Sequence, residues 1–254
     1  TAYTGVGFSG LGLLTNHPFD LAYQAAEAFT TALQKRTKAA GFMKTLLLQR
    51  ICSSFASGRS TAEKMLRRES LDDEEQVRLL DDALSALTSE EAMHLHTIVE
   101  ELSRPEARDP KLAAVRYFLT QHRTDDRTWL EHGCIIFSQY YDTVYAMGIE
   151  LAKLLPNEPI GVYAGAGKSG LFRGEDFTSV ERDDIKKAVK ERSIRLVIAT
   201  DAACEGLNLQ TLGTLINIDL PWNPSRLEQR LGRIKRFGQS RRNVDMLNLV
   251  YHDT

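Results

Sequence analysis

The sequence predicts an α/β protein in which helices flank a parallel sheet and a helical module precedes that sheet. Apolar residues recur at helical spacing from Asp20 to about Arg123, whereas after Gly133 short apolar runs alternate with amphipathic stretches. The second texture is typical of strands and helices that alternate along a parallel sheet. A chain of 254 residues with 43% hydrophobic residues allows one or two domains with a sizeable core. We therefore expect a helical module over 1–109 and an α/β domain over 110–254.

The helical module is expected to follow an N-terminal loop. Residues 1–19 are rich in glycine and contain the pattern GxGxxG, but no strand precedes it and no helix follows directly, so a dinucleotide-binding interpretation fails. Asp20 then begins a first helix, and a second, longer helix runs past Ala62 and Met65. The apolar stripe of the first helix is Leu21, Ala25, Ala28, Phe29, Ala32 and Leu33. The second helix contains Phe42, Thr45, Leu46, Gln49, Ile51 and Cys52.

An acidic stretch from Glu69 to Asp109 continues the helical pattern. Its acids are expected to form a solvated face of packed helices, and no catalytic constellation stands out in it. Asp109 is expected to cap, and Pro110 to start, a further helix. The inward-facing positions are Val77, Leu80, Leu84, Leu87, Met93, Leu95, Ile98 and Leu102 and, in the further helix, Leu112, Val115, Phe118 and Leu119.

Five strands and two helices are expected after Gly133. The strands are Ile135–Phe137, Ile160–Tyr163, Ile194–Ala199, Leu215–Asp219 and Val244–Tyr251, and the helices are Tyr140–Leu155 and Asp183–Glu191. In open α/β sheets, ligands bind outside the carboxyl ends of the strands. Polar clusters follow the first, third and fourth strands, at Ser138-Gln139, 200–208 and 219–224. Three such clusters on one edge of the sheet predict a binding site there.

The last cluster leads into an arginine-rich helix over 226–239, with Asn223 as its N-cap and Pro224 in its first turn. At about 100° per residue, three apolar residues share one stripe and a row of polar residues shares another. The apolar stripe is Leu227, Leu231 and Ile234, and the polar row is Arg226, Gln229, Arg230, Arg233 and Arg236. Composition alone favours a solvated basic helix, but a row of arginines at the binding edge favours an anionic group with several oxygens, such as phosphate.

Charge and cysteine content narrow the class of protein further. The formal net charge is −2, yet 226–242 contains many arginines and Glu228 as its one acid, so the distribution favours a local polyanion partner. The three cysteines are single and far apart, with neither a disulfide framework nor zinc spacing, which favours a reducing, cytosolic setting and no metal site. No apolar run is long enough to span a membrane. No leader sequence follows Thr1, and we expect a fragment of a longer chain.

Three segments carry a resemblance to a known family. IIFSQY (135–140), VIATDAACEGLNL (197–209) and DLPWNPSRLEQRLGRIKRFGQ (219–239) resemble motifs IV, V and VI of superfamily 2 helicases. They are more narrowly similar to the Snf2-type ATPases, and the third is most similar to the bacterial RapA-like branch. The resemblance covers 110–254 well. In the helical half it is loose, with LLLQRICSS (46–54) the most similar piece. It implies a RecA-like sheet that is one of two lobes, with ATP between the lobes and DNA running across both.

The resemblance assigns the arginine-rich helix to ATP. Arg233 and Arg236 match the phosphate-facing pair of the family, and Arg236 is the expected arginine finger, a group worth about 10³–10⁵ in rate. Gln229 and Arg230 are expected to position this helix or to relay between sites. ATP would be bound with Mg²⁺, held mainly by an N-terminal RecA-like lobe.

The other two motifs are assigned to DNA and to coupling. Thr200 resembles the residue that contacts a DNA phosphate, and Ser138 and Gln139 resemble strand-end contacts to the DNA backbone. The stretch with Asp201, Glu205 and Gly206 resembles the segment that couples DNA to nucleotide.

The phosphate loop and the acidic metal-binding box of the first lobe are absent from the sequence. A GKS sequence ends the segment 164–169, but the P-loop pattern needs glycine where Val162 stands. The residues from Leu171 to Gly174 read as a loop, where a P-loop requires a helix N-terminus. In the resemblance this is a surface loop in which Lys168 or Arg173 contacts DNA. We therefore expect the 254-residue chain to be inactive as an ATPase by itself.

The resulting hypothesis is the C-terminal lobe of an ATP-dependent double-stranded DNA translocase, a hydrolase in a bacterial cytoplasm associated with the nucleoid. Its partners would be duplex DNA, the N-terminal lobe, and a protein partner on the acidic helices, with no membrane. Two alternatives stay open. One is a strand-separating superfamily 2 helicase acting on DNA or RNA. The turn from Asp219 to Pro224 argues against it. The other is a catalytically inert protein-interaction lobe, against which Arg233 and Arg236 speak.

Overall fold

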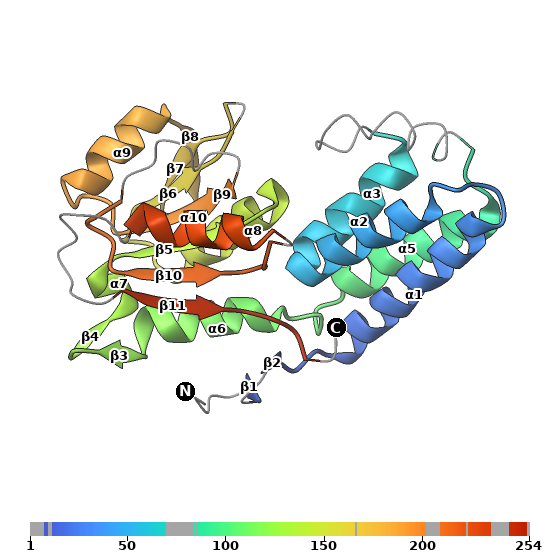
Figure 1. Ribbon diagram of the computed structural model, residues 1–254, viewed down its shortest axis with the longest axis horizontal. Coiled ribbons are helices and arrows are strands. Elements are labelled where there is room, and N and C mark those ends of the chain that lie inside the picture. The colour runs from blue at the N-terminus through green and yellow to red at the C-terminus, as the bar shows by residue number, and fades with distance from the viewer. Residues whose placement is uncertain are drawn as a thin grey trace. The chain divides into compact units, whose positions relative to one another are not determined.

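The protein forms two compact units. The computed structural model describes residues 8–9, 12–69, 84, 86–165, 167–201, 209–221, 223–234 and 244–252. One unit is a helical region and the other is built on a seven-stranded, mostly parallel sheet with helices on its faces (Figure 1). The predicted class, an α/β fold preceded by helices, is confirmed. No helix in the described part of the chain is long and apolar enough to cross a membrane.

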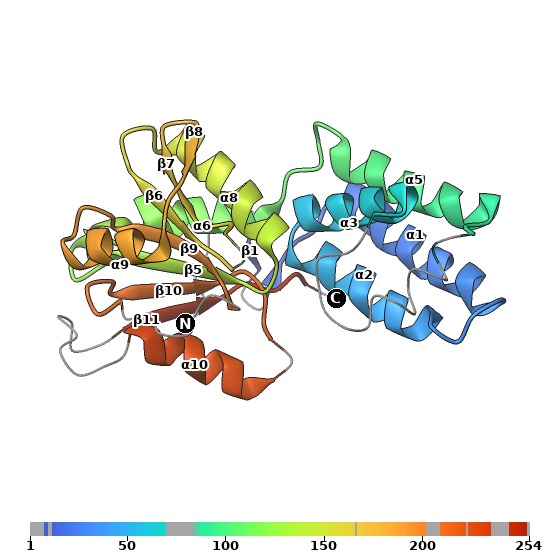
Figure 2. The same ribbon diagram turned by 90° about the horizontal axis from the view of Figure 1, so that it is seen from above.

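The helical unit spans Leu14–Asp109 and includes Tyr251. Its helices are α1 (His17–Gln34), α2 (Ala40–Ser53), α3 (Phe55–Arg67) and α5 (Ser89–Ser103). Helix α1 packs against α2 and α5, and α3 packs against the same two helices (Figure 2). Helix α1 begins where the Asn16 side chain accepts a hydrogen bond from the Phe19 amide. The core includes Phe19, Phe29, Leu33, Met43, Leu47, Ile51, Leu95 and Ile98.

The prediction of one long second helix is wrong, because the helix is interrupted at Ser54. Ser54 is extended (φ −158°, ψ 157°), and its hydroxyl accepts a hydrogen bond from the Ser57 amide, which starts a new helix. Serine favours this N-cap geometry over a helix interior. In α2, Phe42 is 40% exposed, and the buried side is formed by Met43, Leu47, Arg50 and Ile51.

The acidic face is less solvated than predicted. Glu91 and Glu101 are buried, whereas Met93, predicted to face inward, is 56% exposed. Glu91 is buried because it completes the capping box with Thr88 at the start of α5 and pairs with Arg36. Of the predicted apolar positions, Leu84 is buried, and residues 70–83 lie outside the described part of the chain.

The N-terminal segment contains two short paired strands within the region predicted to be a loop. Strands β1 (Phe8–Ser9) and β2 (Gly12–Leu13) pair antiparallel, and the Leu13 amide donates to the Val250 carbonyl. Helix α1 begins at His17, three residues before the predicted start. The glycines of the GxGxxG pattern lie outside the described residues.

The α/β unit contains 110–250 and the two short N-terminal strands. Its main sheet has the order β11-β10-β5-β9-β6-β7-β8, and the first five of these strands are parallel. Their bounds are β5 (Cys134–Ser138), β6 (Ile160–Tyr163), β7 (Gly170–Arg173), β8 (Asp176–Ser179), β9 (Leu196–Thr200), β10 (Thr214–Asn217) and β11 (Asp245–Asn248). A small hairpin, β3 (Arg123–Thr124) with β4 (Arg127–Thr128), and helix α7 (Trp129–His132) precede β5.

Helices cover both faces of this sheet. Figure 2 shows α6 (Pro110–Thr120) and α8 (Tyr141–Leu154) on one side and α10 (Pro224–Ile234) on the other. Helix α9 (Arg182–Lys190) shares a core cluster with Ile234 of α10. That cluster includes Ile135, Phe137, Val197, Ala199, Leu212 and Leu215 from strands β5, β9 and β10 and the loop before β10. The predicted start of a helix at Pro110 is confirmed.

The loop predicted for 171–174 is instead strand β7, which pairs antiparallel with β6 and β8. Phe172 drives this pairing, because its ring is buried against Phe177 and Tyr145. Gly170 leaves room for the Phe177 ring, which would lie 2.3 Å from a Cβ atom at that position.

Candidate functional site

The three predicted polar clusters meet at one edge of the sheet. In the parallel register, Ser138 at the end of β5 lies opposite Thr200 at the end of β9, and Phe137 lies opposite Asn217 at the end of β10. The carboxyl ends of three neighbouring strands therefore lie side by side, as the sequence predicted.

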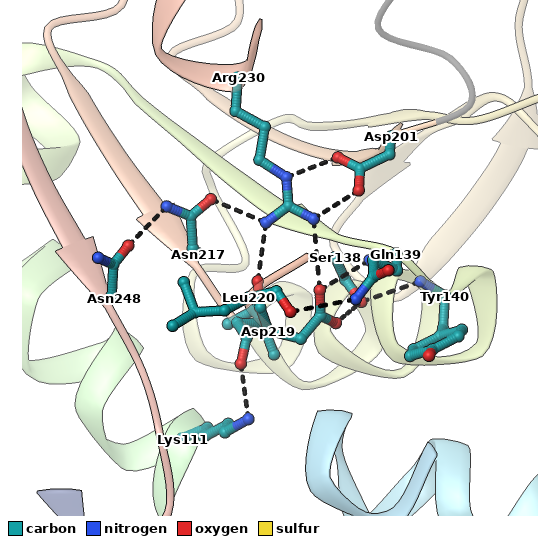
Figure 3. A network of polar contacts seen from close by, with 11 residues as sticks. Lys111, Ser138, Gln139, Tyr140, Asp201, Asn217, Asp219, Leu220, Arg230 and Asn248 are labelled. Carbon is teal, nitrogen blue, oxygen red and sulfur yellow. Dashed lines mark hydrogen bonds and ion pairs between the residues drawn. The ribbon is translucent and has the colours of Figure 1, made fainter. Parts of the chain in front are cut away.

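Asp219 lies at the centre of this edge (Figure 3). Its Oδ2 accepts a hydrogen bond from the Ser138 hydroxyl at 2.5 Å, and its Oδ1 accepts one from the Gln139 amide at 2.9 Å. Its Oδ1 also faces Arg230 Nη2 at 3.3 Å, and its backbone carbonyl accepts from Arg230 Nη1 at 2.8 Å. Asp219 therefore joins the end of β5 to helix α10.

Arg230 is 1% exposed and uses its whole guanidinium inside the protein. Nε and Nη2 form a bidentate pair with Asp201 at 2.5 and 2.7 Å, and Nη1 also donates to Asn217 Oδ1 at 2.9 Å. Together with the two Asp219 contacts, these five interactions match the five N–H donors of arginine. Burial by itself would lower the pKa of Arg230, but the bonds and charges of Asp201 and Asp219 outweigh it, so that pKa is raised. We call this group the carboxyl-edge network: Ser138, Gln139, Asp201, Asn217, Asp219 and Arg230.

Two further residues support the network and were not predicted. Lys111, 2% exposed, donates from Nζ to the Ile218 carbonyl at 2.6 Å. Asn248 of β11 accepts at 2.8 Å from the Asn217 side-chain amide, which orients the Asn217 oxygen toward Arg230. Helical spacing places Lys111 on the same face as the buried Val115, which was the available signal for a buried lysine.

Helix α10 starts as predicted, but its polar row is divided differently. The Asn223 side chain caps the helix by accepting from the Ser225 amide, and Pro224 is its first residue. Arg226 and Gln229 are exposed, whereas Arg230 lies on the buried face with Ile234. The prediction that Arg230 shares the outward row is therefore wrong. An inward position of a helix usually carries an apolar residue. Arginine occupies this position because two acidic residues at the strand ends bind its guanidinium.

Arg233 and the coupling residues are only partly covered by the described chain. The Arg233 side chain is half-buried, and its Nε is shielded from solvent without a hydrogen bond among the described residues. Arg236, Glu205 and Gly206 lie outside the described residues. Their assigned roles stay predictions.

The residues predicted to contact DNA differ in exposure. Ser138 is fully buried, and its hydroxyl also accepts from the Tyr140 amide at 3.1 Å, so a phosphate contact would require its bonds to open. Gln139 is half-buried and next to it, and Thr200 is 5% exposed at the end of β9. Lys168 is half-buried, with Nζ 5.0 Å from the centre of the Tyr141 ring.

The GKS segment is built as a tight turn between two strands. The Ser169 hydroxyl donates to the Ala164 carbonyl at 2.7 Å and accepts from the Ala164 amide at 3.0 Å. Strand β7 follows directly, so the turn does not lead into the helix N-terminus that a P-loop requires. The segment is therefore not a P-loop.

Metal-binding residues do not gather in the described part of the chain. No group of three or more His, Cys, Asp or Glu side chains there could hold a metal ion. Burial raises the pKa of the Cys134 thiol to about 12, which leaves it protonated at neutral pH.

Comparisons with known proteins agree with this geometry. Residues 111–238 match the family described as the helicase conserved C-terminal domain. The chain is 47% identical over 83 residues to the uncharacterized ATP-dependent helicase YqhH of Bacillus subtilis, covering 33% of this chain and 14% of that protein. It is 39% identical over 69 residues to the RNA polymerase-associated protein RapA of Vibrio cholerae, covering 26% of this chain and 7% of that protein. It is 41% identical over 64 residues to the ATP-dependent RNA helicase eIF4A of Scheffersomyces stipitis, covering 25% of this chain and 16% of that protein.

A solved structure extends the similarity to the helical unit. The C-terminal part of the Fun30 ATPase domain matches 94% of this chain and 83% of its own length, with a TM-score of 0.54 and 17% identity, a likeness of fold. The chain matches only a small fraction of the length of its curated relatives. The family match spans half of the chain, and the chain therefore belongs to the helicase conserved C-terminal domain family, the C-terminal lobe of superfamily 2 helicases.

Proposed function

We propose that this chain is the C-terminal lobe of a Snf2-type, ATP-dependent translocase on double-stranded DNA, similar to the RapA branch. The carboxyl-edge network carries the proposal. It ties the ends of three strands to helix α10, which supports a single edge for the residues assigned to DNA and to ATP. Two similarities support the Snf2-type assignment. The fold of the C-terminal part of the Fun30 ATPase domain matches 94% of this chain, helical unit included, and the chain is 39% identical to RapA over 69 residues.

The ATP side of the proposal rests on α10. The half-buried Arg233, with its Nε unbonded among the described residues, fits an anionic phosphate oxygen. Arg233 and Arg236 would contact the phosphates, and Arg236 would act as the arginine finger. When bound with Mg²⁺, ATP supplies the phosphoryl group whose transfer drives movement. An N-terminal RecA-like lobe would hold most of the nucleotide, with Asp201, Glu205, Gly206, Gln229 and Arg230 coupling the two sides.

The DNA side is the rest of the same edge. Gln139 follows β5, and Thr200 ends the adjacent strand β9. Lys168 lies in the loop after β6, which is next to β9 in the sheet. These groups would contact phosphates without reading bases. Ser138 would contribute by positioning Gln139 through Asp219 unless its internal bonds open. The remaining acidic surface of the helical unit would bind a protein partner. The setting would be the cytoplasm of a bacterium, at the nucleoid.

A strand-separating helicase on RNA or DNA is the second candidate. The 41% identity over 64 residues to eIF4A, an ATP-dependent RNA helicase, favours it. The two candidates differ in the nucleic acid that the edge prefers.

Nucleic-acid preference tests the proposal. Fluorescence anisotropy should show weak, sequence-independent binding to duplex DNA that falls steeply between about 50 and 200 mM salt, because phosphate contacts release counterions. Duplex DNA should be preferred over single-stranded RNA. Preference for RNA would select the second candidate, and affinity that is independent of salt would contradict both.

ATP hydrolysis by the 254-residue chain is expected to be absent, with or without DNA. The GKS turn is not a P-loop, so Lys168→Ala should change nothing in this assay. Turnover that survives Lys168→Ala would show that the chain holds a complete ATP site of another kind.

A further inference from the structure

Asp219 occupies the position where the two sides of the proposed site meet. On one side its carboxylate binds the Ser138 hydroxyl and the Gln139 amide, and on the other it faces the Arg230 guanidinium (Figure 3). One oxygen, Oδ1, serves both sides, because the Gln139 amide and Arg230 Nη2 share it at 2.9 and 3.3 Å. A shift of either partner therefore changes the geometry of the other contact.

The backbone around Asp219 is held separately. Lys111 Nζ binds the preceding carbonyl, that of Ile218, and Arg230 Nη1 binds the carbonyl of Asp219 itself. Ile218 also donates its amide to the Phe137 carbonyl of β5 at 2.9 Å. The Asp219 side chain adds a second connection, because displacement of the Ser138 hydroxyl or the Gln139 amide reaches Arg230 through its carboxylate.

We propose that Asp219 is a positioning residue that holds the end of β5 and helix α10 in one register, so that a ligand bound at the first stabilises the second. The inference rests on the proposed function, in which the end of β5 faces DNA and α10 faces ATP. Asp219 itself touches neither ligand. It acts through Gln139 on one side and Arg230 on the other.

Hydrogen–deuterium exchange on the 254-residue chain tests this role. The exchange of peptides covering 224–234 is measured with and without saturating duplex DNA, in the wild type and in Asp219→Asn. Asparagine keeps the shape of aspartate but removes the charge that faces Arg230 and one acceptor oxygen. Asp183→Asn is the matched control, because Asp183 is 90% exposed on α9 and pairs with Lys186 on the same helix.

The expected result has two parts. Without DNA, Asp219→Asn should speed exchange about tenfold both in α10 and around Ser138, two segments that are distant in sequence, while Asp183→Asn leaves them unchanged. With DNA, α10 should be protected in the wild type and in Asp183→Asn but not in Asp219→Asn. A residue needed only for stability would raise exchange without abolishing the DNA-dependent protection.

Two results would overturn the inference: exchange of α10 in Asp219→Asn equal to that in Asp183→Asn, or equal protection by DNA in both. Failure of the proposed function is separate, since the wild type would then not bind duplex DNA in the anisotropy assay. The measurement without DNA would still decide whether Asp219 links the two segments.

A second variant covers the case in which Asp219→Asn does not fold. Ser138→Ala removes one bond to Asp219 Oδ2 and leaves the Arg230 contacts in place. It should speed exchange of α10 although Ser138 lies on β5. Unchanged exchange of α10 in a folded Ser138→Ala protein would contradict the proposal.

Discussion

Each of the two units buries an arginine–carboxylate pair, and the pairs differ in which partner is buried. In the α/β unit the arginine is inside, since the Arg230 side chain is 1% exposed and Asp201 is 11% exposed. In the helical unit the carboxylate is inside, since Glu91 is 1% exposed and Arg36 is 29% exposed. Both pairs are bidentate. Their surroundings show what each pair is for.

The role of the Glu91 pair is structural. Glu91 completes the capping box of α5, and Arg36 links that helix to the end of α1. The Arg230 pair holds much more than its helix. It fixes Asn217 and Asp219 at the end of β10 and Asp201 beyond β9, at the edge where ligands bind in such sheets. A buried cation with every donor used is costly to build, and its position indicates that it shapes a site.

The largest expected effect is the loss of the buried cation. Arg230→Met should lower the free energy of unfolding of the α/β unit by about 3–5 kcal/mol, because Asp201 and Asp219 are left without their partner in a buried setting. Urea titration followed by circular dichroism measures this. Arg226→Met, at an exposed position of the same helix, is the control and should change stability by less than about 0.5 kcal/mol.

Equal and small costs for the two arginine variants would remove the contrast between the units. The network would then be a surface feature that the fold tolerates without depending on it.

The apolar side of α10 should give the next effect. Ile234 is fully buried in the sheet core, so Ile234→Ala should cost about 2–5 kcal/mol. Leu231 is half-buried and should cost less than Ile234 when replaced by alanine. Thermal unfolding of both variants measures the order. The reverse order would mean that α10 lies on the sheet through a different face.

The Glu91 pair should give a smaller, pH-dependent effect. Burial by itself would raise the pKa of Glu91, but its bonds to Arg36 and Thr88 outweigh this and lower that pKa below the ordinary value of about 4.3. The lowered pKa of Glu91 stabilises the folded unit at pH values above the ordinary pKa of glutamate. This contribution to the free energy of unfolding is lost as the pH falls through the lowered pKa. Glu91→Gln should therefore cost about 1–3 kcal/mol at pH 7.

The cost of Glu91→Gln should shrink as the pH falls through the lowered pKa of Glu91, because the wild type then loses the charge as well. Urea titrations at several pH values measure it, with Glu90→Gln at the exposed neighbouring position as the control. A cost that stays constant until the wild type itself unfolds in acid would show that the charge of Glu91 is unimportant.

Sequence patterns predicted the central parallel strands well because these strands are buried on both faces. Residues 160–163 form a strand with the predicted ends, and the clusters after β5, β9 and β10 meet as expected. The helical unit was harder to predict, because the surfaces of its helices mix apolar and polar residues. The choice between Phe42 and Met43 as the inward residue depends on packing partners that spacing alone does not show.

The candidate site was predicted at the level of segments but not of contacts. Asp219 and Lys111 were missed as site residues, since a charged side chain is normally exposed and its burial depends on partners that are distant in the chain. Lys111 and Ile218 are 107 positions apart. Arg230 was placed in the outward row for the same reason, because its partner Asp201 lies on another strand end.

The smallest expected effect on stability belongs to the arginines assigned to ATP, and it provides the most direct test. In a protein that carries this lobe together with an N-terminal lobe, ATP turnover per folded molecule is measured for Arg233→Ala and Arg236→Ala. Turnover should fall by about 10³-fold or more for Arg236→Ala, with nucleotide binding less affected, because the finger acts where charge develops in the transition state. The melting temperature should stay nearly unchanged. Loss of folding in these variants with turnover per folded molecule preserved would contradict the account, since Arg233 and Arg236 would then be structural like Arg230.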